Sequence, residues 1–214
     1  MSRIGDWAAD NFDREMMRRC IEIAVQSGRN GEYPYGAVIT RAGKLVVEST
    51  NRVAHEHDVT RHAEAESISL AQKLLGTISL SDCALYATSE PCVYCAYAIR
   101  ESRLGRVVYA LHSPYMGGHS RWDVLTDRGL SEKMPEVFDA PPEIVSGFMA
   151  EETEQALLEW NPLVWGFVRR RGLFVTGPRA YFAAPPPTKV SKRVMRHFMP
   201  VLRRLVYDRF GRKM

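Results

Sequence analysis

Apolar residues recur at steps of three and four between residues 11 and 27, which is the spacing of a helix with one buried face. The apolar positions are Phe12, Met16, Cys20, Ile23 and Ala24. Asp10 or Asn11 can cap the start of this helix, and Gly28 can end it. The pattern predicts a helix that runs to about Ser27 and packs on a core.

Shorter apolar runs follow, separated by residues typical of turns. We predict strands at 35–40 and 44–48 around a turn at 41–43, a helix at 63–75, a strand at 83–88, a helix at 92–101 and a strand at 106–110. A loop at 51–61 precedes the second helix. This order predicts an α/β domain with a mixed sheet, made of one hairpin followed by right-handed crossovers, with helices on its faces.

The second half of the chain has weaker patterns. Residues 111–142 are rich in Gly, Pro, Ser and His without a clear period, and a loop of this length is usually a functional lid or partly disordered. We predict a short strand at 143–146, a helix at 149–160 with Leu157 and Leu158 inward, and a hairpin of strands at 164–168 and 173–175.

On this interpretation the chain has a main domain at 1–161, a hairpin with a Pro-rich linker at 162–187 and a basic amphipathic helix at 188–214. The apolar positions of the last helix are Val190, Val194, Phe198, Val201 and Leu205. Pro200 is expected to bend it. Its apolar face can dock on its own domain or on a dimer mate, and its basic face can bind anionic lipid or RNA phosphates. We favour docking.

Charge is distributed unevenly along the chain, which has 214 residues and a net charge of +4. Residues 188–214 hold nine basic side chains and one acidic one, whereas residues 1–187 hold 20 basic and 24 acidic ones. The main domain is therefore mildly acidic. The net charge gives no reason to expect that this domain binds nucleic acid.

Composition also bears on location. No run of about eighteen apolar residues occurs, so we expect no transmembrane segment. The first ten residues lack the pattern of a secretory signal. Two of the four cysteines lie in one C-x-x-C, which is typical of a reducing compartment with metal-binding or redox thiols. We therefore expect a cytoplasmic protein.

Two short fragments carry candidate chemistry, His62-Ala63-Glu64 and Cys92-Val93-Tyr94-Cys95. A catalytic zinc site needs three His or Cys ligands and an open fourth position. Cys92 and Cys95 are three residues apart, so they share one face of a helix, and its first turn favours thiolates. Residues two apart on a helix do not share a face, so His62 and Glu64 diverge unless His62 lies at the non-helical entry of its helix. Such a divergence would leave His62 for the metal and Glu64 for the substrate.

Each fragment has an ordinary alternative. A lone C-x-x-C is commonly a redox pair or two buried thiols, and a lone His-x-Glu is usually a surface accident. A structural zinc ion needs a fourth protein ligand, but Cys20 and Cys83 are better explained as core residues. Together, each at the junction of a strand and a helix, the fragments form the signature of zinc-dependent nucleobase deaminases. We therefore predict Zn²⁺ bound by His62, Cys92 and Cys95.

Further blocks of sequence extend this likeness over residues 10–160. They are 33–38, Asn51, 58–64, 89–92, 102–108, 117–118, 123–125 and 147–152. Together they resemble the cytidine deaminase-like superfamily, in particular its branch of guanine deaminases and wobble-adenosine tRNA deaminases. The resemblance implies a three-layer α/β/α fold with a five-stranded mixed sheet, one zinc ion and commonly a homodimer. The chain after Pro162 resembles nothing in that branch.

The resemblance also implies roles for single residues. Zinc lowers the pKa of its water, and Glu64 accepts that proton, protonates a ring nitrogen and then gives a proton to the leaving ammonia. Asn51 is expected to hydrogen-bond the base, although it can equally brace a loop. The backbone N–H of Ala63 is expected to meet a polar group of the substrate.

Two positions depart from the family pattern. Arg61 replaces a small residue beside the metal, and it can bind an anionic group of the substrate or pair with Glu56, Asp58 or Glu66. Ser113 stands where the tRNA enzymes have an Asp that contacts the RNA backbone. Both departures count against an RNA substrate.

We therefore predict a zinc-dependent hydrolytic deaminase that acts on a small heterocyclic substrate, a guanine-like purine base or its nucleoside ahead of a pyrimidine. The first alternative is a tRNA adenosine-to-inosine deaminase, which the basic tail favours. An alternative of another class is an inactive, zinc-stabilised interaction subunit. The presence of Glu64 argues against this last alternative, because a structural zinc site does not need a free carboxylate beside it.

Overall fold

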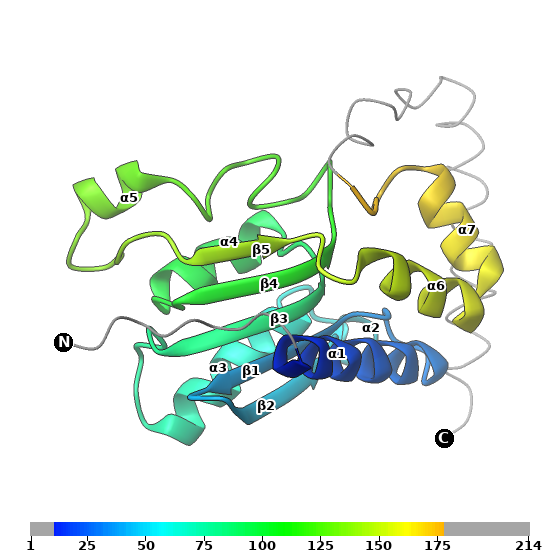
Figure 1. Ribbon diagram of the computed structural model, residues 1–214, viewed down its shortest axis with the longest axis horizontal. Helices are drawn as coiled ribbons and strands as arrows, with labels where there is room; N and C mark the ends of the chain where they lie inside the picture. The colour runs from blue at the N-terminus through cyan, green and yellow to red at the C-terminus, as the bar shows by residue number, and fades with distance from the viewer. Residues whose placement is uncertain (1–10, 178–214) are drawn as a thin grey trace.

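The computed structural model describes residues 11–177, in which helices cover both faces of a mixed sheet (Figure 1). The strands are β1 (Gly36–Arg41), β2 (Lys44–Thr50), β3 (Cys83–Ser89), β4 (Arg106–Leu111) and β5 (Glu143–Ser146). Their order is β2-β1-β3-β4-β5, with β1 antiparallel to β2 and β3, and with β3, β4 and β5 parallel. The predicted three-layer α/β/α fold with a five-stranded mixed sheet is confirmed.

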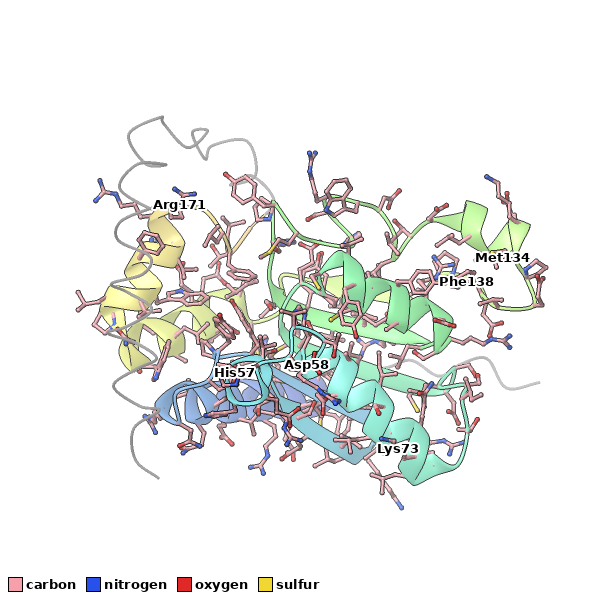
Figure 2. The ribbon with its side chains drawn as sticks, turned by 180° about the vertical axis from the view of Figure 1, so that it is seen from behind. His57, Asp58, Lys73, Met134, Phe138 and Arg171 are labelled. Carbon is pink, nitrogen blue, oxygen red and sulfur yellow. The ribbon has the colours of Figure 1, made fainter. Side chains whose placement is uncertain are left out.

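The helices divide between the two faces of the sheet. Helix α1 (Asn11–Arg29) covers one face, and α3 (Ala63–Leu75) and α4 (Val93–Glu101) cover the other (Figures 1 and 2). Helices α6 (Ala150–Trp160) and α7 (Pro162–Arg170) pack on each other, and α6 also contacts α1. Figure 2 shows Arg171, after α7, at the opposite end of the molecule from Met134. None of the helices within residues 11–177 is long and apolar enough to span a bilayer.

Alternating side chains of the central strands fill two separate cores. Ile39 on β1 packs in the cluster shared with α3 and α4, whereas its neighbour Val38 packs in the cluster shared with α1. Leu85 and Tyr86 on β3 divide in the same way. Successive side chains of a strand point to opposite faces, so a strand that is buried on both faces is apolar throughout. This is why these strands are nearly continuous apolar runs.

A buried ion pair joins α1 to the sheet. The carboxylate of Asp13 accepts from Arg106 Nη1 at 2.9 Å and Nη2 at 2.8 Å, and from the hydroxyl of Tyr86 at 2.5 Å. Asp13 and Arg106 are both buried. Two charges removed from water need such partners, because an unpaired buried charge is costly.

The first helix does not end where the sequence suggested. It continues to Arg29, so Gly28 lies inside α1 rather than after it. A Cβ atom on Gly28 would lie 2.6 Å from the ring of Trp160. The glycine therefore allows α6 to pack closely on α1, which is a tertiary reason that the local pattern does not contain.

The predicted hairpin at 164–168 and 173–175 is wrong, because its first half lies in helix α7. The Asn161 side chain accepts from the Val164 N–H at 3.1 Å, and Pro162 occupies the first turn. Both features start a helix. Trp165 then packs into a core at the end of the sheet. Val175 instead pairs with His112, so it makes a β-bridge with a distant residue.

Two short helices lie in the segments that we expected to be loops. Helix α2 (Val53–Glu56) interrupts residues 51–61, and α5 (Arg128–Lys133) interrupts residues 111–142. The Asp127 side chain caps α5 by accepting from the Gly129 N–H at 2.7 Å. The predicted linker and basic helix at 178–214 lie outside the described residues.

Candidate active site

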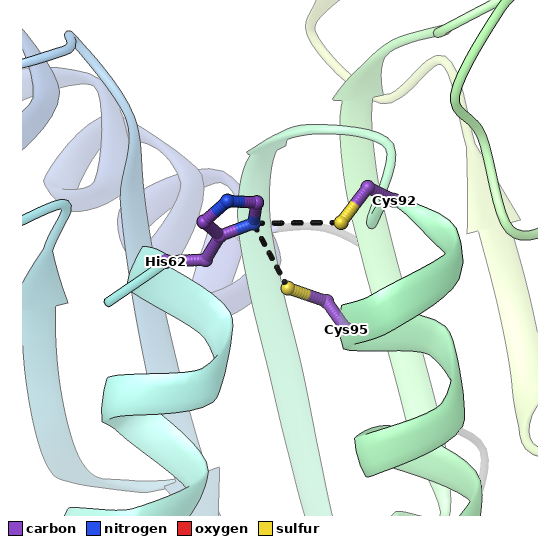
Figure 3. Close-up of side chains that lie close together, drawn as sticks. All are labelled: His62, Cys92 and Cys95. Atoms are coloured by element: carbon purple, nitrogen blue, oxygen red, sulfur yellow. Dashed lines mark hydrogen bonds between the residues drawn. The ribbon is translucent and has the colours of Figure 1, made fainter. Parts of the chain in front are cut away.

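Three metal-ligating side chains meet beside the starts of α3 and α4 (Figure 3). His62 Nδ1 lies 3.4 Å from Cys92 Sγ and 3.5 Å from Cys95 Sγ. Zinc bonds of about 2.3 Å to sulfur and about 2.1 Å to nitrogen, at tetrahedral angles, separate ligand atoms by roughly 3.6 Å. The group within residues 11–177 has three members. It therefore fits a zinc ion with one coordination position left open.

The backbone before each helix explains how these residues converge. His62 is the residue before α3 and Cys92 is the residue before α4, and both are extended, with ψ of 149° and 168°. Because His62 precedes the helix, it does not follow the helical spacing that would turn it away from Glu64. His62 is thus at the non-helical entry, and the side chains of His62 and Glu64 line the same cavity. Cys95 follows in the first turn of α4.

Glu64 is a buried carboxyl group at the edge of this cluster. It is 7% exposed, and its Oε2 lies 3.6 Å from Cys95 Sγ. Burial, helped by the negative charge of Cys92, raises the pKa of Glu64 to about 7. A group with a pKa near neutrality both accepts and donates protons readily. A bound zinc ion is positively charged and acts on this pKa in the opposite direction.

The two thiols differ in how easily they lose a proton. A hydrogen bond from Cys95 lowers the pKa of Cys92 to about 4, against the effect of burial and with help from His62. The same hydrogen bond, together with burial, raises the pKa of Cys95 well above its ordinary value. Cys92 is therefore a thiolate before metal binds. As a ligand to zinc, Cys95 would give up its proton, because zinc takes the thiolate form.

A cavity of about 300 Å³ lies beside the cluster. Its apolar walls are formed by Tyr33, Tyr35, Val53, Val59, Met116 and Phe174. Its polar lining includes Asn51, Glu64 and Ser113. Aromatic walls with a few polar groups are typical of a site for a small molecule.

Asn51 braces the start of α3 with one end of its amide. Its Oδ1 accepts from the backbone N–H of Ala63 at 2.9 Å. The Ala63 N–H therefore has a partner other than the polar group of the substrate that we expected. The amide nitrogen of Asn51 has no hydrogen-bond partner among residues 11–177, and the side chain lines the cavity. Asn51 can thus brace the loop and donate to a base at the same time.

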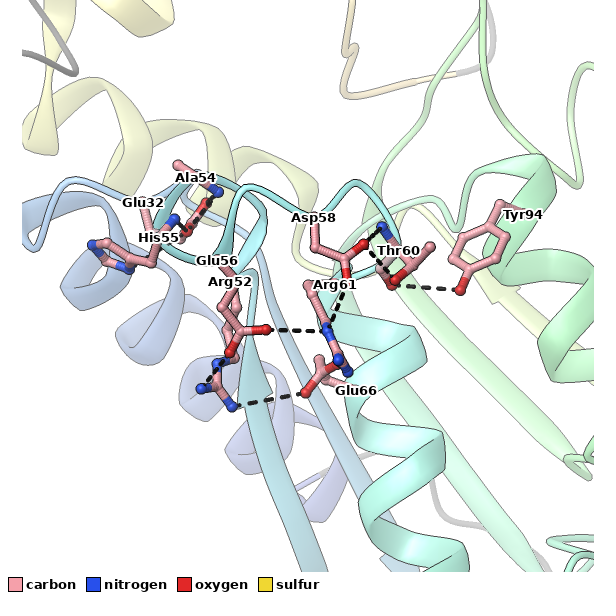
Figure 4. A network of polar contacts seen from close by, with 10 residues as sticks. All are labelled: Glu32, Arg52, Ala54, His55, Glu56, Asp58, Thr60, Arg61, Glu66 and Tyr94. Carbon is pink, nitrogen blue, oxygen red and sulfur yellow. Dashed lines mark hydrogen bonds and ion pairs between the residues drawn. The ribbon is translucent and has the colours of Figure 1, made fainter.

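Arg61 belongs to an ion-pair network outside the cavity (Figure 4). Its Nε lies 3.1 Å from Glu56 Oε2 and 3.1 Å from Asp58 Oδ2, and its Nη1 lies 3.0 Å from Glu66 Oε1. Arg52 pairs with Glu56 and Glu66 in the same network. Of the two alternatives for Arg61, the structure shows the ion pair. The expected substrate contact of Arg61 stays without structural support.

Two buried polar residues that line the cavity received no binding role from the sequence. Ser113 is 1% exposed, and within residues 11–177 its Oγ has no hydrogen-bond partner. The Glu90 carboxylate accepts from the N–H groups of Ser113, His119 and Ser120, at 2.7, 3.1 and 2.6 Å, and from Ser120 Oγ at 2.8 Å. The only signal for Glu90 was its place directly before Pro91-Cys92.

The sequence around the candidate site is similar to those of known deaminases. Residues 10–111, which include His62, Glu64, Cys92 and Cys95, match the family described as the cytidine and deoxycytidylate deaminase zinc-binding region. The tRNA-specific adenosine deaminase of Haemophilus influenzae is 34% identical over 149 residues, which are 68% of this chain and 81% of that protein. The guanine deaminase of Bacillus subtilis is 40% identical over 97 residues, which are 44% of this chain and 61% of that protein.

The extent of these matches differs between relatives. The tRNA(Ile)-lysidine synthase of Deinococcus radiodurans is 34% identical over 156 residues, but this chain spans only 25% of its length. A solved structure from studies of A-to-I editing by tRNA:A34 deaminases superposes with a TM-score of 0.60 and 30% identity. That match covers 67% of this chain and 99% of the solved chain.

Proposed function

We propose that this chain, which belongs to the cytidine and deoxycytidylate deaminase family, releases ammonia from an aminated purine base such as guanine, or from its nucleoside. Members of this family are zinc-binding hydrolases of C–N bonds. The observation that carries the proposal is the meeting of a His/Cys/Cys cluster and a buried carboxylate at one cavity of about 300 Å³. A homodimer, which the resemblance implies, is part of the proposal, and sedimentation velocity of the full chain tests it.

In this proposal the ligands to zinc are His62 Nδ1, Cys92 Sγ and Cys95 Sγ. When bound, zinc supplies the Lewis acidity that makes water a nucleophile near neutral pH. Glu64 moves the protons: its carboxylate accepts one from water and passes it to a ring nitrogen, then accepts the second proton of that water from the added oxygen and delivers it to the departing amino group. Its burial supports this role, because burial raises the pKa of Glu64 to about 7, and a carboxyl group with a pKa near neutrality is present in both its protonated and its ionised form.

The cavity supports a single planar base as the substrate. A volume of about 300 Å³ lies at the lower end of the range of about 300–1,000 Å³ for small-molecule pockets. The free amide nitrogen of Asn51 and the hydroxyl of Ser113 offer hydrogen bonds to ring nitrogens or a carbonyl group. The Ser113 hydroxyl oxygen is buried and has no hydrogen-bond partner within residues 11–177, so a ligand would satisfy it.

Charge around the cavity favours a small neutral substrate over RNA. Residues 11–177 carry 18 basic and 22 acidic side chains. Arg52 and Arg61, which flank the cavity residues Val53 and Val59, are neutralised by the carboxylates of their ion-pair network. Binding of RNA phosphates depends on cations that are free to pair with them.

A second candidate function is deamination of adenosine in tRNA. The observation that favours it is coverage, since the match to the tRNA-specific deaminase of Haemophilus influenzae extends over 68% of this chain and the match to guanine deaminase over 44%. The basic residues 188–214, which lie outside the described part, are where such a substrate would find free cations.

An ammonia-release assay on a panel of amines separates these functions. Zinc-loaded full-length protein is given guanine, guanosine, adenine, adenosine, cytosine, cytidine and tRNA. We expect the highest kcat/KM for guanine or guanosine. Turnover of tRNA alone would replace the first function with the second. Zinc-loaded protein that releases no ammonia from any of them would support an inactive, zinc-stabilised subunit.

A further inference from the structure

An aromatic side chain reaches the cavity from the part of the chain that follows the family match. The match ends at residue 111, whereas Phe174 lies after α7 and lines the cavity. Phe174 is only 7% exposed. A residue from this segment is therefore part of the candidate site, although the segment has no counterpart in the motifs that define the family.

The ring of Phe174 packs against two other aromatic side chains. It stacks on Trp165 of α7, with ring centroids 6.0 Å apart and an angle of 16° between the planes. It also contacts Tyr35 at 5.6 Å and 53°. Stacked and tilted arrangements at these distances are favourable for aromatic pairs. The ring is thus fixed before any ligand enters.

The backbone beside Phe174 is fixed as well. The Val175 N–H donates to the carbonyl of His112 at 3.0 Å, and the His112 N–H donates to the carbonyl of Val175 at 2.8 Å. His112 directly precedes the cavity residue Ser113. These two bonds tie the segment that carries Phe174 to the loop that carries Ser113.

From this geometry we infer that Phe174 is a specificity-determining residue, whose ring stacks on the substrate and favours bicyclic purines over single-ring pyrimidines. The inference rests on the proposed function. Attraction between stacked rings grows with the number of atoms in contact, so a purine gains more than a pyrimidine from the same aromatic surface. Loss of one base–aromatic stack weakens binding by roughly tenfold, within a range of about 5- to 150-fold.

Binding measured without turnover tests this inference. Zinc-loaded Glu64→Gln protein is titrated with guanine and with cytosine by calorimetry, alone and combined with Phe174→Leu, Phe174→Tyr or Phe167→Leu. Leucine preserves an apolar contact with Trp165 but removes the ring, and tyrosine preserves the ring. Phe167 lies on α7 and does not line the cavity, so its substitution is the matched control. Zinc content and thermal stability are measured for each protein.

We expect Phe174→Leu to raise the Kd for guanine roughly tenfold and the Kd for cytosine less than about threefold. Phe174→Tyr and Phe167→Leu should leave both constants within about twofold. Equal weakening of both bases, unchanged guanine binding in Phe174→Leu, or no guanine binding at all by the Glu64→Gln protein would overturn the inference. Failure of the proposed function is distinguishable, because it is a lack of ammonia release by the wild-type protein in the panel assay.

Discussion

The metal side of the cavity and its loop side are built from different kinds of structure. The metal side consists of His62, Glu64, Cys92 and Cys95, which come from the starts of two helices. The loop side consists of Ser113, Met116 and Phe174, which lie outside helices and strands. Regular backbone positions the residues of the metal side, whereas long-range contacts position those of the loop side.

Two buried charged side chains make long-range hydrogen bonds to the loops between residues 111 and 142. Glu90 accepts four hydrogen bonds from residues 113–120. Arg100 is 2% exposed and donates to five acceptors between residues 124 and 139. Because each of these two charged side chains is buried and bonds to several loop groups at once, it fixes the loops strongly. The comparison teaches that local sequence positions the residues of the metal side. The loop side depends instead on side chains that are far away in the sequence.

Removal of one ligand breaks the metal side and has the largest expected effect. Cys95→Ala should lower zinc content from one ion per chain to near zero and lower ammonia release by more than about 100-fold, because three protein ligands are the fewest of a catalytic zinc site. Elemental analysis and the ammonia assay measure both. Cys83→Ala is the matched control, since Cys83 is also buried, on β3, but does not belong to the group of His62, Cys92 and Cys95. One zinc ion per chain in Cys95→Ala would contradict the ligand assignment.

Removal of the Glu90 carboxylate breaks the loop side without touching a ligand. Glu90→Ala leaves the N–H groups of Ser113, His119 and Ser120 without their acceptor, which should cost about 3 kcal/mol of unfolding free energy. We expect KM to rise by roughly tenfold or more while zinc content is kept, because the loop that carries Ser113 shifts. Glu90→Gln keeps one acceptor and should recover part of both losses. Wild-type stability and KM in Glu90→Ala would refute this account of the loop.

The Asp13–Arg106 pair belongs to neither side and should affect stability alone. Burial acts to raise the pKa of Asp13, but hydrogen bonds from Arg106 and Tyr86 outweigh it, and the net pKa is below the ordinary 3.8. The charged carboxylate therefore stabilises the fold above pH 3.8, and that contribution is lost as pH falls through the lowered folded value. Denaturant unfolding at a series of pH values should show Asp13→Asn less stable than wild type at neutral pH, with a gap that narrows in acid. A constant gap would argue against this linkage.

Substitution of Arg61, which lies outside the cavity, has the smallest expected effect. Its side chain is 44% exposed and pairs with three carboxylates. Exposed ion pairs contribute at most about 1 kcal/mol, so Arg61→Ala should change unfolding free energy by no more than that, and kcat/KM for guanine by less than about threefold. Steady-state kinetics with guanine and with a guanine nucleotide check this. A selective loss for the nucleotide would restore the alternative in which Arg61 binds an anionic substrate group.

The metal side could be predicted from sequence because its information is local. His62 and Glu64 at the start of one helix, and Cys92 and Cys95 at the start of another, each follow from spacing and from the order of strands and helices. The core strands were equally clear, since apolar runs bounded by turn residues mark buried strands. The role of Glu64 stays a proposal until it is measured.

The loop side could not be predicted because its contacts join residues far apart in the chain. Nothing near Phe174 indicates that Val175 pairs with His112. The β-branched and aromatic residues of 164–168 favoured a strand, but the Asn161 cap and the burial of Trp165 produced a helix. The sequence left Arg61 open between two roles, and the structure shows its ion pairs with three nearby carboxylates.

The central claim is that Glu64 moves protons at a zinc site formed by the metal side. Glutamine has the size of glutamate but cannot take up a proton at neutral pH, so Glu64→Gln tests the claim most directly. Zinc content and thermal stability should stay at wild-type values, while ammonia release from guanine falls by about 10²–10⁴-fold or more. A zinc-loaded, folded Glu64→Gln protein that releases ammonia at the wild-type rate would contradict the account.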